Sequence, residues 1–188
     1  MIVRKLLLFS ACAGLVLCVC NLTTNKNTSS TTATSVSQLK ITNGAISGWQ
    51  MVTTADSFGV WAAADFHNDI DGGDKPYTDR GLIEVADFHL LGPNGTELGV
   101  HAYFMDFGTE AAATAMFQYQ ASQSIYTPHV AITGYDNTVA FGYAVLGGIT
   151  AFAHFKKFYI ELPFTLYSAQ GQAISDANLF LGYLKAKI

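Results

Sequence analysis

Residues 69–81 read Asp69-Ile70-Asp71-Gly72-Gly73-Asp74-Lys75-Pro76-Tyr77-Thr78-Asp79-Arg80-Gly81 and hold four carboxylates and two adjacent glycines. The amphipathic pattern of residues 55–70 predicts a short helix with Asp56 or Ser57 as N-cap, and Gly72-Gly73 ends it. Residues 75–80 are expected to add one turn, with Pro76 near its start and Gly81 closing it. A β-hairpin is predicted after Gly81, so this stretch joins helical to extended structure.

The predicted hairpin consists of residues 82–91 and 97–107 around the turn Gly92-Pro93-Asn94-Gly95. Proline at the second position and glycine at the fourth are typical of a type I turn. If the turn closes at Pro93-Asn94, Leu91 pairs with Thr96. His101 then falls opposite Ala86, while His89 falls opposite Leu98 on the other face. This register predicts no zinc site between the two histidines.

The rest of the chain predicts two more helices and three more strands. Thr109 caps an alanine-rich helix that runs to about Gln123, and a terminal helix starts at Ser175 or Asp176. Strands are predicted over 138–144, 148–155 and 158–164, and residues 40–51 are expected to form a loop whose apolar side chains attach to the core. Short turns between strands, without a βαβ rhythm, indicate an α+β domain: an antiparallel β-sheet with helices packed mainly on one face.

Residues 1–20 have the composition of a signal peptide. Arg4 and Lys5 precede an apolar run of about 15 residues, which is shorter than the roughly 20 that span a bilayer. Residues 21–39 are rich in Ser, Thr and Asn and predict a flexible tether, and residues 40–188 are taken as a single domain. We therefore expect export to the cell envelope, at the periplasmic or outer surface, and contact with the membrane only through this leader or a lipid on it.

A lipid anchor on Cys20 is one of two ways in which this leader can be processed. Leu17 lies three residues before Cys20, as in bacterial lipoprotein signals, although Val19 replaces the usual small residue. Cys12 has the better local match but too short an apolar run before it. The other possibility is ordinary signal cleavage near Cys20 or Asn21.

Charge and cysteine content exclude several classes of site. Without Arg4 and Lys5, eight basic residues remain against 14 acidic ones, and no Lys or Arg occurs between Gly81 and His154. A surface that follows phosphates needs clustered cations, so nucleic acid is excluded and phosphorylated ligands are disfavoured. All three cysteines lie in the leader, so the predicted domain has no disulfide, thiolate metal site or cysteine nucleophile.

Several short motifs resemble an exported bacterial protein family of unknown function, domain-of-unknown-function family 6599. They are Ile70-Asp71-Gly72-Gly73 with Tyr77 four residues on, Met105-Asp106-Phe107-Gly108, Ala113-Thr114-Ala115-Met116-Phe117 and Phe155-Lys156-Lys157-Phe158-Tyr159-Ile160-Glu161. The resemblance covers residues 49–187. Where the family usually has Ala-Glu after the glycines, this chain has Asp74-Lys75-Pro76, which implies a shorter helix there. The family implies no chemistry.

The carboxylates of residues 69–81 have two interpretations. Four of them on one tight loop could coordinate a hard cation, which takes several oxygen ligands. Their spacing does not fit the twelve-residue calcium loop, so helix caps and turns are the favoured interpretation, and no metal, cofactor or catalytic residue is predicted. Asp106 is likewise either a catalytic acid or a cap for the next helix. The candidate binding residues are Asp69, Asp71, Asp74, Tyr77 and Asp106, and the structural glycines are Gly72, Gly73, Gly81 and Gly108.

Two classes of function remain open. The first is a non-catalytic, membrane-tethered binding or interaction domain for a small molecule, a glycan or a protein, in which tyrosines on a polar face could line a groove. The second is a hydrolase or metal-dependent enzyme that uses the acidic segment 69–79. Convergence of three or more of its carboxylates in one pocket would favour the enzyme.

Overall fold

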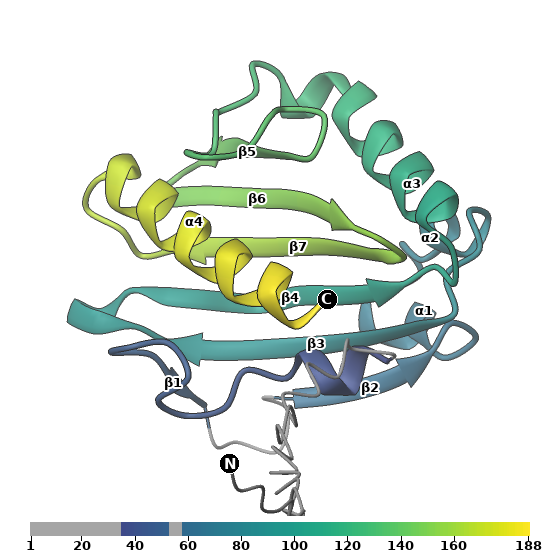
Figure 1. Cartoon of the computed structure of the whole chain (residues 1–188), viewed down its shortest axis with the longest axis horizontal. Helices are drawn as coiled ribbons and strands as arrows, with labels where there is room; N and C mark the ends of the chain where they lie inside the picture. Colours follow the sequence, from purple (N-terminus) through teal and green to yellow (C-terminus); the bar gives the residue numbers. More distant parts are fainter. Residues whose placement is uncertain (1–34, 53–57) are drawn as a thin grey trace, which may run out of the picture.

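The computed structural model describes residues 35–52 and 58–188. The predicted leader and most of the predicted tether lie outside these residues. The elements follow one another along the chain as shown in Figure 1: η1 Val36–Leu39, β1 Gln50–Met51, β2 Phe58–Ala62, α1 Phe66–Asp69, α2 Lys75–Thr78, β3 Glu84–Leu91, η2 Pro93–Gly95, β4 Glu97–Asp106, α3 Glu110–Ser122, η3 Ser124–Tyr126, β5 Ala140–Val145, β6 Gly148–Phe155, β7 Phe158–Thr165 and α4 Gln170–Lys187.

The described strands form one antiparallel sheet. Its order is β1-β3-β4-β7-β6-β5, and β2 pairs with β3 along the same edge as β1. The pairs β3–β4, β4–β7, β5–β6 and β6–β7 are antiparallel as well. The predicted α+β class with an antiparallel sheet is therefore confirmed.

The two long helices lie against opposite faces of this sheet. Alternation along β7 directs Phe158 and Ile160 into one buried cluster and Tyr159 into the other. The first cluster includes residues of α4 and η1, and the second includes residues of α1 and α3. The sequence had predicted helices packed mainly on one face of the sheet. They divide between two because both sets of strand side chains are apolar and each needs a cover.

The helix predicted over residues 55–70 is not formed in the described part of that segment. Residues 58–62 form strand β2, and only the single turn α1 follows. Phe58, Val60 and Trp61 suit a strand, and β2 pairs along β3 from Phe58↔Phe88 to Ala62↔Glu84. Pairing with a free sheet edge thus outweighs the local helical pattern. The N-caps proposed there, Asp56 and Ser57, lie outside the described residues.

The β3–β4 hairpin is confirmed, but its turn and register differ from the prediction. Asn94 has φ 58°, which a type I turn excludes at that position. Leu91 pairs with Glu97, and an irregularity between Phe88 and Leu90 then changes the register of the remaining β3–β4 pairs. As a result Ala86 lies opposite Phe104 and Leu98 lies opposite Leu90. The predicted places of His101 and His89 are therefore wrong.

Both ends of the described chain pack more extensively than the sequence suggested. Helix α4 begins at Gln170 and not at Ser175 or Asp176. Its Ala177, Phe180, Leu181 and Leu184 are buried, as is Ile188 after its last turn. Val36 and Leu39 of η1 are fully buried. The folded part therefore includes the last residues of the segment predicted as a flexible tether over 21–39.

Glycines fix the exit from the acidic stretch. Gly72 has φ 80° and Gly81 has φ 90°, in the left-handed region that glycine adopts without strain. Between them, α2 is a single turn with Pro76 near its start. Asp71 also has a positive φ, of 50°.

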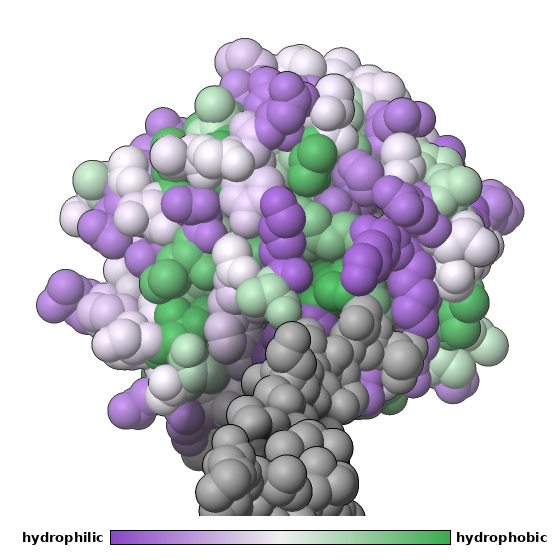
Figure 2. All heavy atoms as spheres, viewed as in Figure 1, coloured by the Kyte–Doolittle hydropathy of each residue, from purple (hydrophilic) through white to green (hydrophobic). Residues whose placement is uncertain are grey.

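The side of the molecule covered by α4 shows apolar residues in small groups between polar ones (Figure 2). No helix in residues 35–52 or 58–188 has the length and apolar character needed to cross a membrane.

Candidate functional site

A hollow of about 360 Å³ lies beside α1 and is lined by Asp69, Ile70, Asp71, His101 and Tyr103. Asp69 is the last residue of α1, and His101 and Tyr103 come from β4. The β4–β7 pairing is interrupted between Leu98 and Tyr103, and His101 lies in this irregular stretch with φ 71°. The irregularity turns the His101 side chain toward the end of α1.

Asp87 places a buried carboxylate next to this hollow. It lies directly opposite Tyr103 in the β3–β4 pair, and only 8% of the residue is exposed. Its Oδ1 atom has no hydrogen-bond partner among the described residues. An unpaired buried carboxylate oxygen is costly, so this atom is a feature that packing alone does not explain.

Burial raises the pKa of the Asp87 carboxyl to about 7. The negative charge of Asp69 adds to this increase, while the backbone N–H groups of Phe88 and His101 act in the opposite direction. A buried carboxyl group beside a second carboxylate favours a positively charged neighbour.

Tyr103 connects the other two polar groups of the hollow. Its hydroxyl donates to Asp69 Oδ2 at 2.9 Å and contacts His101 Nδ1 closely. Burial and the hydrogen bond to Asp69 raise the pKa of the Tyr103 phenol, so the hydroxyl keeps its proton. Because that single proton points to Asp69, the hydroxyl oxygen must act as acceptor in its contact with His101, and Nδ1 must carry a proton. In neutral His101 the free lone pair is then on Nε2.

Asp69, Asp87 and His101 together form a compact set of donors. One possible ligand atom from each lies within 4.8 Å of the other two. The set combines a half-buried, a buried and an exposed residue, so it extends from the sheet interior to solvent. Such an arrangement can bind a small cation without a large cavity.

The structure separates the five candidate binding residues into four places. Asp69 and Asp71 line the hollow. Asp74 precedes α2, where its carbonyl accepts from the Tyr77 and Thr78 N–H groups. Asp106 forms an ion pair with Lys157 at 2.6 Å and accepts from the Gly108 N–H at 2.7 Å. Asp106 therefore holds the turn before α3, whereas the N-cap of that helix is Thr109, so the predicted helix cap at Asp106 is wrong.

Tyr77, the fifth candidate, belongs to a separate polar cluster around Glu161. Tyr77 Oη, Tyr159 Oη and Gln120 Nε2 all donate to Glu161 Oε1, at 3.0, 2.8 and 3.0 Å. Burial raises the pKa of the Glu161 carboxyl, and these three donors lower it by a smaller amount. Glu161 is partly exposed as a residue. The cluster joins α2, α3 and β7 and is well supplied with partners.

Sequence reasoning missed Asp87, His101 and Tyr103 as site residues. One signal was present: Asp87 interrupts an apolar strand sequence, Val85-Ala86-Asp87-Phe88. The register assumed for the hairpin had placed His101 opposite Ala86, which hid its proximity to Asp87. The irregularities in β4 that correct this register have no clear local sequence signal.

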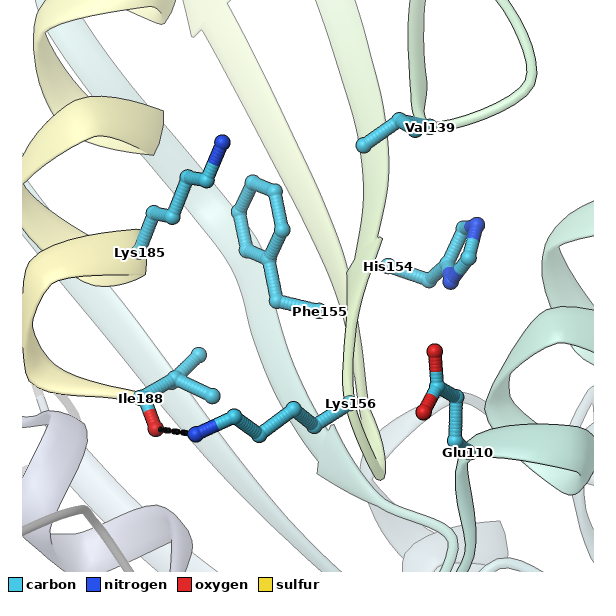
Figure 3. Close-up of a pocket in the computed structure, with 7 residues that line it drawn as sticks. All are labelled: Glu110, Val139, His154, Phe155, Lys156, Lys185 and Ile188. Atoms are coloured by element: carbon cyan, nitrogen blue, oxygen red, sulfur yellow. Dashed lines mark hydrogen bonds between the residues drawn. The ribbon is translucent and has the colours of Figure 1, made fainter.

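A second pocket, also of about 360 Å³, lies between α3 and α4 at the end of β6 (Figure 3). Its polar groups are largely engaged. His154 Nδ1 contacts Thr114 Oγ1 at 3.3 Å, His154 Nε2 donates to the Thr138 carbonyl at 3.0 Å, and Lys156 Nζ donates to the carbonyl of Ile188. Unlike the hollow at Asp69, this pocket contains no buried polar atom that lacks a partner among the described residues.

Comparisons with protein-family models, with curated proteins and with solved structures found no match for this chain. The resemblance to an exported bacterial family therefore stays a prediction, and the argument for function rests on the hollow itself.

Proposed function

We propose that this chain is a non-catalytic binding domain that takes a small, positively charged ligand in the hollow at Asp69, Asp71 and His101. The observation that carries the proposal is the buried Asp87 carboxylate: its Oδ1 has no partner in the described structure, and one of its oxygens lies within 4.8 Å of donor atoms of Asp69 and His101. A bound cation would offset the cost of burying that carboxylate.

The surrounding charges favour a cationic ligand. Asp69, Asp71 and Asp87 place three carboxyl groups at the hollow. The two basic residues nearest in sequence are engaged elsewhere: Lys75 forms an ion pair with Asp79, and Arg80 donates to the Pro76 carbonyl and stacks on Tyr119. A phosphate or a nucleic acid would meet net repulsion at this site.

The alternative, a hydrolase or metal-dependent enzyme built on residues 69–79, receives less support from the geometry. Of the four carboxylates in that segment, Asp69 and Asp71 line the hollow, while Asp79 pairs with Lys75 and Asp74 lies at the start of α2. Convergence of at least three was the condition that favoured an enzyme. The binding domain therefore stays the preferred proposal.

Thermal unfolding with a panel of cations and amines tests the proposed binding. Sodium, magnesium, calcium, manganese and zinc chlorides, ethylamine and spermidine are added separately to chelator-treated protein. At least one of them other than sodium should raise the thermal midpoint of the wild type, because a ligand that binds only the native state stabilises it. Asp87→Asn should abolish that increase, and Asp79→Asn, an acidic change outside the hollow, should preserve it. A panel with no effect on the wild type overturns the proposal.

We further propose that the domain is exported and held at the membrane by its leader, with or without a lipid on Cys20. The composition of residues 1–20, and the change to Ser, Thr and Asn after them, supports this. Intact-mass measurement of the protein from a membrane fraction is the test. A mature chain that starts near Cys20 or Asn21 is expected, and a product that retains residues 6–19 contradicts export by this route.

A further inference from the structure

The geometry points to a divalent first-row transition-metal ion as the ligand, bound by Asp69, Asp87 and His101. This inference rests on the proposed binding at the same hollow and names the chemistry of its ligand. It follows from the positions of the three side chains, their donor atoms and the residues that hold them.

The spacing of the three donors is close to that of a metal site. Three ligand atoms about 2.0–2.2 Å from one ion lie about 3–4 Å from one another. In this protein one donor atom from each residue lies within 4.8 Å of the others. Closure by about 1 Å, which side-chain rotation supplies, would complete the geometry.

The donor types select the class of ion. Ca²⁺ and Mg²⁺ prefer sites made of oxygen atoms alone, with six or more ligands in total. An imidazole nitrogen with two carboxylates suits Zn²⁺, Mn²⁺, Fe²⁺ or Co²⁺ instead. The two carboxylates also balance the charge of a divalent ion. Because the hollow is open to solvent, water can take the positions that the protein leaves free.

Tyr103 acts as the outer partner that metal-binding side chains usually have. Its hydroxyl contacts both Asp69 Oδ2 and His101 Nδ1, two of the three proposed ligands. Because Nδ1 carries the proton, Nε2 is the metal donor. Outer partners of this kind stabilise the tautomer protonated on Nδ1. Tyr103 is buried and held in β4, so it fixes two ligands relative to the sheet.

Asp87 supplies the observation that separates this site from an ordinary acidic cluster. More than nine-tenths of the residue is buried, and its Oδ1 has no partner among the described residues. Asp87 is held in the centre of β3, which pairs with β4 on one side and β2 on the other. The third ligand is thus part of the rigid sheet, while Asp69 and His101 reach it from α1 and from the irregular stretch of β4.

The test is calorimetric titration of the full chain with Cys12, Cys18 and Cys20 replaced by serine, which removes thiolates that would bind metal. Chelator-treated protein is titrated separately with Zn²⁺, Co²⁺, Mn²⁺, Mg²⁺ and Ca²⁺. One ion per chain is expected for at least one of the first three, with weaker binding of Mg²⁺ and Ca²⁺. The Co²⁺ complex should also show the visible absorption of a site with nitrogen and oxygen ligands.

Three variants and two controls locate the binding. Asp87→Asn and His101→Asn should each weaken it at least tenfold, and asparagine tolerates the positive φ at residue 101. Tyr103→Phe should weaken it about 10–100-fold, as loss of an outer partner does. Asp79→Asn, an acidic change outside the hollow, and His89→Gln, a histidine elsewhere in the hairpin, should change it less than threefold. Circular dichroism and the thermal midpoint of each metal-free variant confirm that it is folded.

The outcomes are distinguishable from those of the broader proposal. The metal site is overturned if the protein binds none of Zn²⁺, Co²⁺ and Mn²⁺. It is also overturned if Asp87→Asn or His101→Asn binds the metal with an affinity within tenfold of the wild type. If ethylamine or spermidine still raises the thermal midpoint in an Asp87-dependent way, the binding domain stands with an organic cation as its ligand. If no cation or amine binds, both proposals fail.

Discussion

Asp87 has the properties of a residue retained for binding at a cost to stability. Its side chain is buried, its Oδ1 has no partner in the described residues, and burial together with Asp69 raises its pKa to about 7. Functional sites commonly contain such groups, and their removal commonly stabilises the fold. Removal of a buried residue that is kept for structure would instead destabilise the fold.

Asp87→Asn is therefore expected to raise the free energy of unfolding of the ligand-free protein while it weakens binding. The gain should be about 1–3 kcal/mol, the range of the cost for a buried group without its partner. Urea denaturation at neutral pH, with chelator present, measures it. Asp71→Asn, at an exposed residue of the same hollow, should stay within about 0.5 kcal/mol of wild type. A loss of stability in Asp87→Asn would mean that the carboxylate has a structural role.

Glu161 gives a prediction of pH dependence away from the proposed ligands. Burial raises the pKa of its carboxyl above the ordinary 4.5. A raised pKa in the folded state means that this group stabilises the fold fully below pH 4.5, and that its contribution is lost as pH rises through the folded pKa. We therefore expect the free energy of unfolding of the wild type, minus that of Glu161→Gln, to decrease between about pH 4 and pH 8.

Urea denaturation of both proteins across this pH range measures the difference, and contributions from other groups cancel in it. Glu110→Gln, at an exposed acidic residue at the start of α3, is the control and should show a smaller trend. A difference that grows with pH would show that the donors from Tyr77, Tyr159 and Gln120 outweigh burial.

Among the elements, those with strong local signals were predicted well. Helix α3 begins after Thr109, whose side chain accepts from the Ala112 N–H at 3.2 Å, and ends within a residue of the predicted limit. Strand β6 has the predicted limits, and β7 extends one residue further than predicted. Caps, alternation and tight turns all act over a few residues, so one sequence suffices to read them.

Elements that depend on distant partners were predicted poorly, and the candidate site shares this limit. Strand β2 exists because β3 offers a free edge, which a local pattern does not reveal. Asp69 and Asp71 were found because the acidic stretch is conspicuous in the sequence. Asp87 and His101 join them only through the shifted pairing of β3 with β4 and the positive φ of residue 101. That register depends on packing across the whole sheet.

Two helix substitutions should change stability in opposite directions. Thr109→Ala removes the N-cap of α3 and should lower the free energy of unfolding by about 1 kcal/mol. Gly182→Ala should raise it by about 0.5–1 kcal/mol, because residue 182 is an exposed position of α4 with no atom within 4 Å of an added Cβ. Urea denaturation of each variant against wild type checks both, and a stabilising Thr109→Ala or a destabilising Gly182→Ala would contradict the helix assignments.

The molecule as a whole has two buried clusters that share one sheet. Trp49, Phe164 and Phe180 pack edge to face in the first cluster, with ring centroids 4.7–6.2 Å apart. Trp61 packs against the second cluster, on the side of α1 and α3. Every long strand contributes side chains to both clusters, so loss of one should remove the support of the other. The chain is expected to unfold as a single cooperative unit.

The two tryptophans, which are the only ones in the sequence, allow this to be tested face by face. Trp61→Phe leaves Trp49 as the fluorescent reporter of the first cluster, and Trp49→Phe leaves Trp61 as the reporter of the second. Phe180→Ala, added to each, should lower the free energy of unfolding by about 3–5 kcal/mol, the usual cost of truncating a fully buried phenylalanine. Both reporters should show the same loss, although Phe180 belongs only to the Trp49 cluster. Leu179→Ala, at an exposed neighbour on α4, is the control and should leave both curves nearly unchanged. A loss seen by Trp49 and not by Trp61 would show that the α4 side opens while the sheet and its binding hollow stay folded.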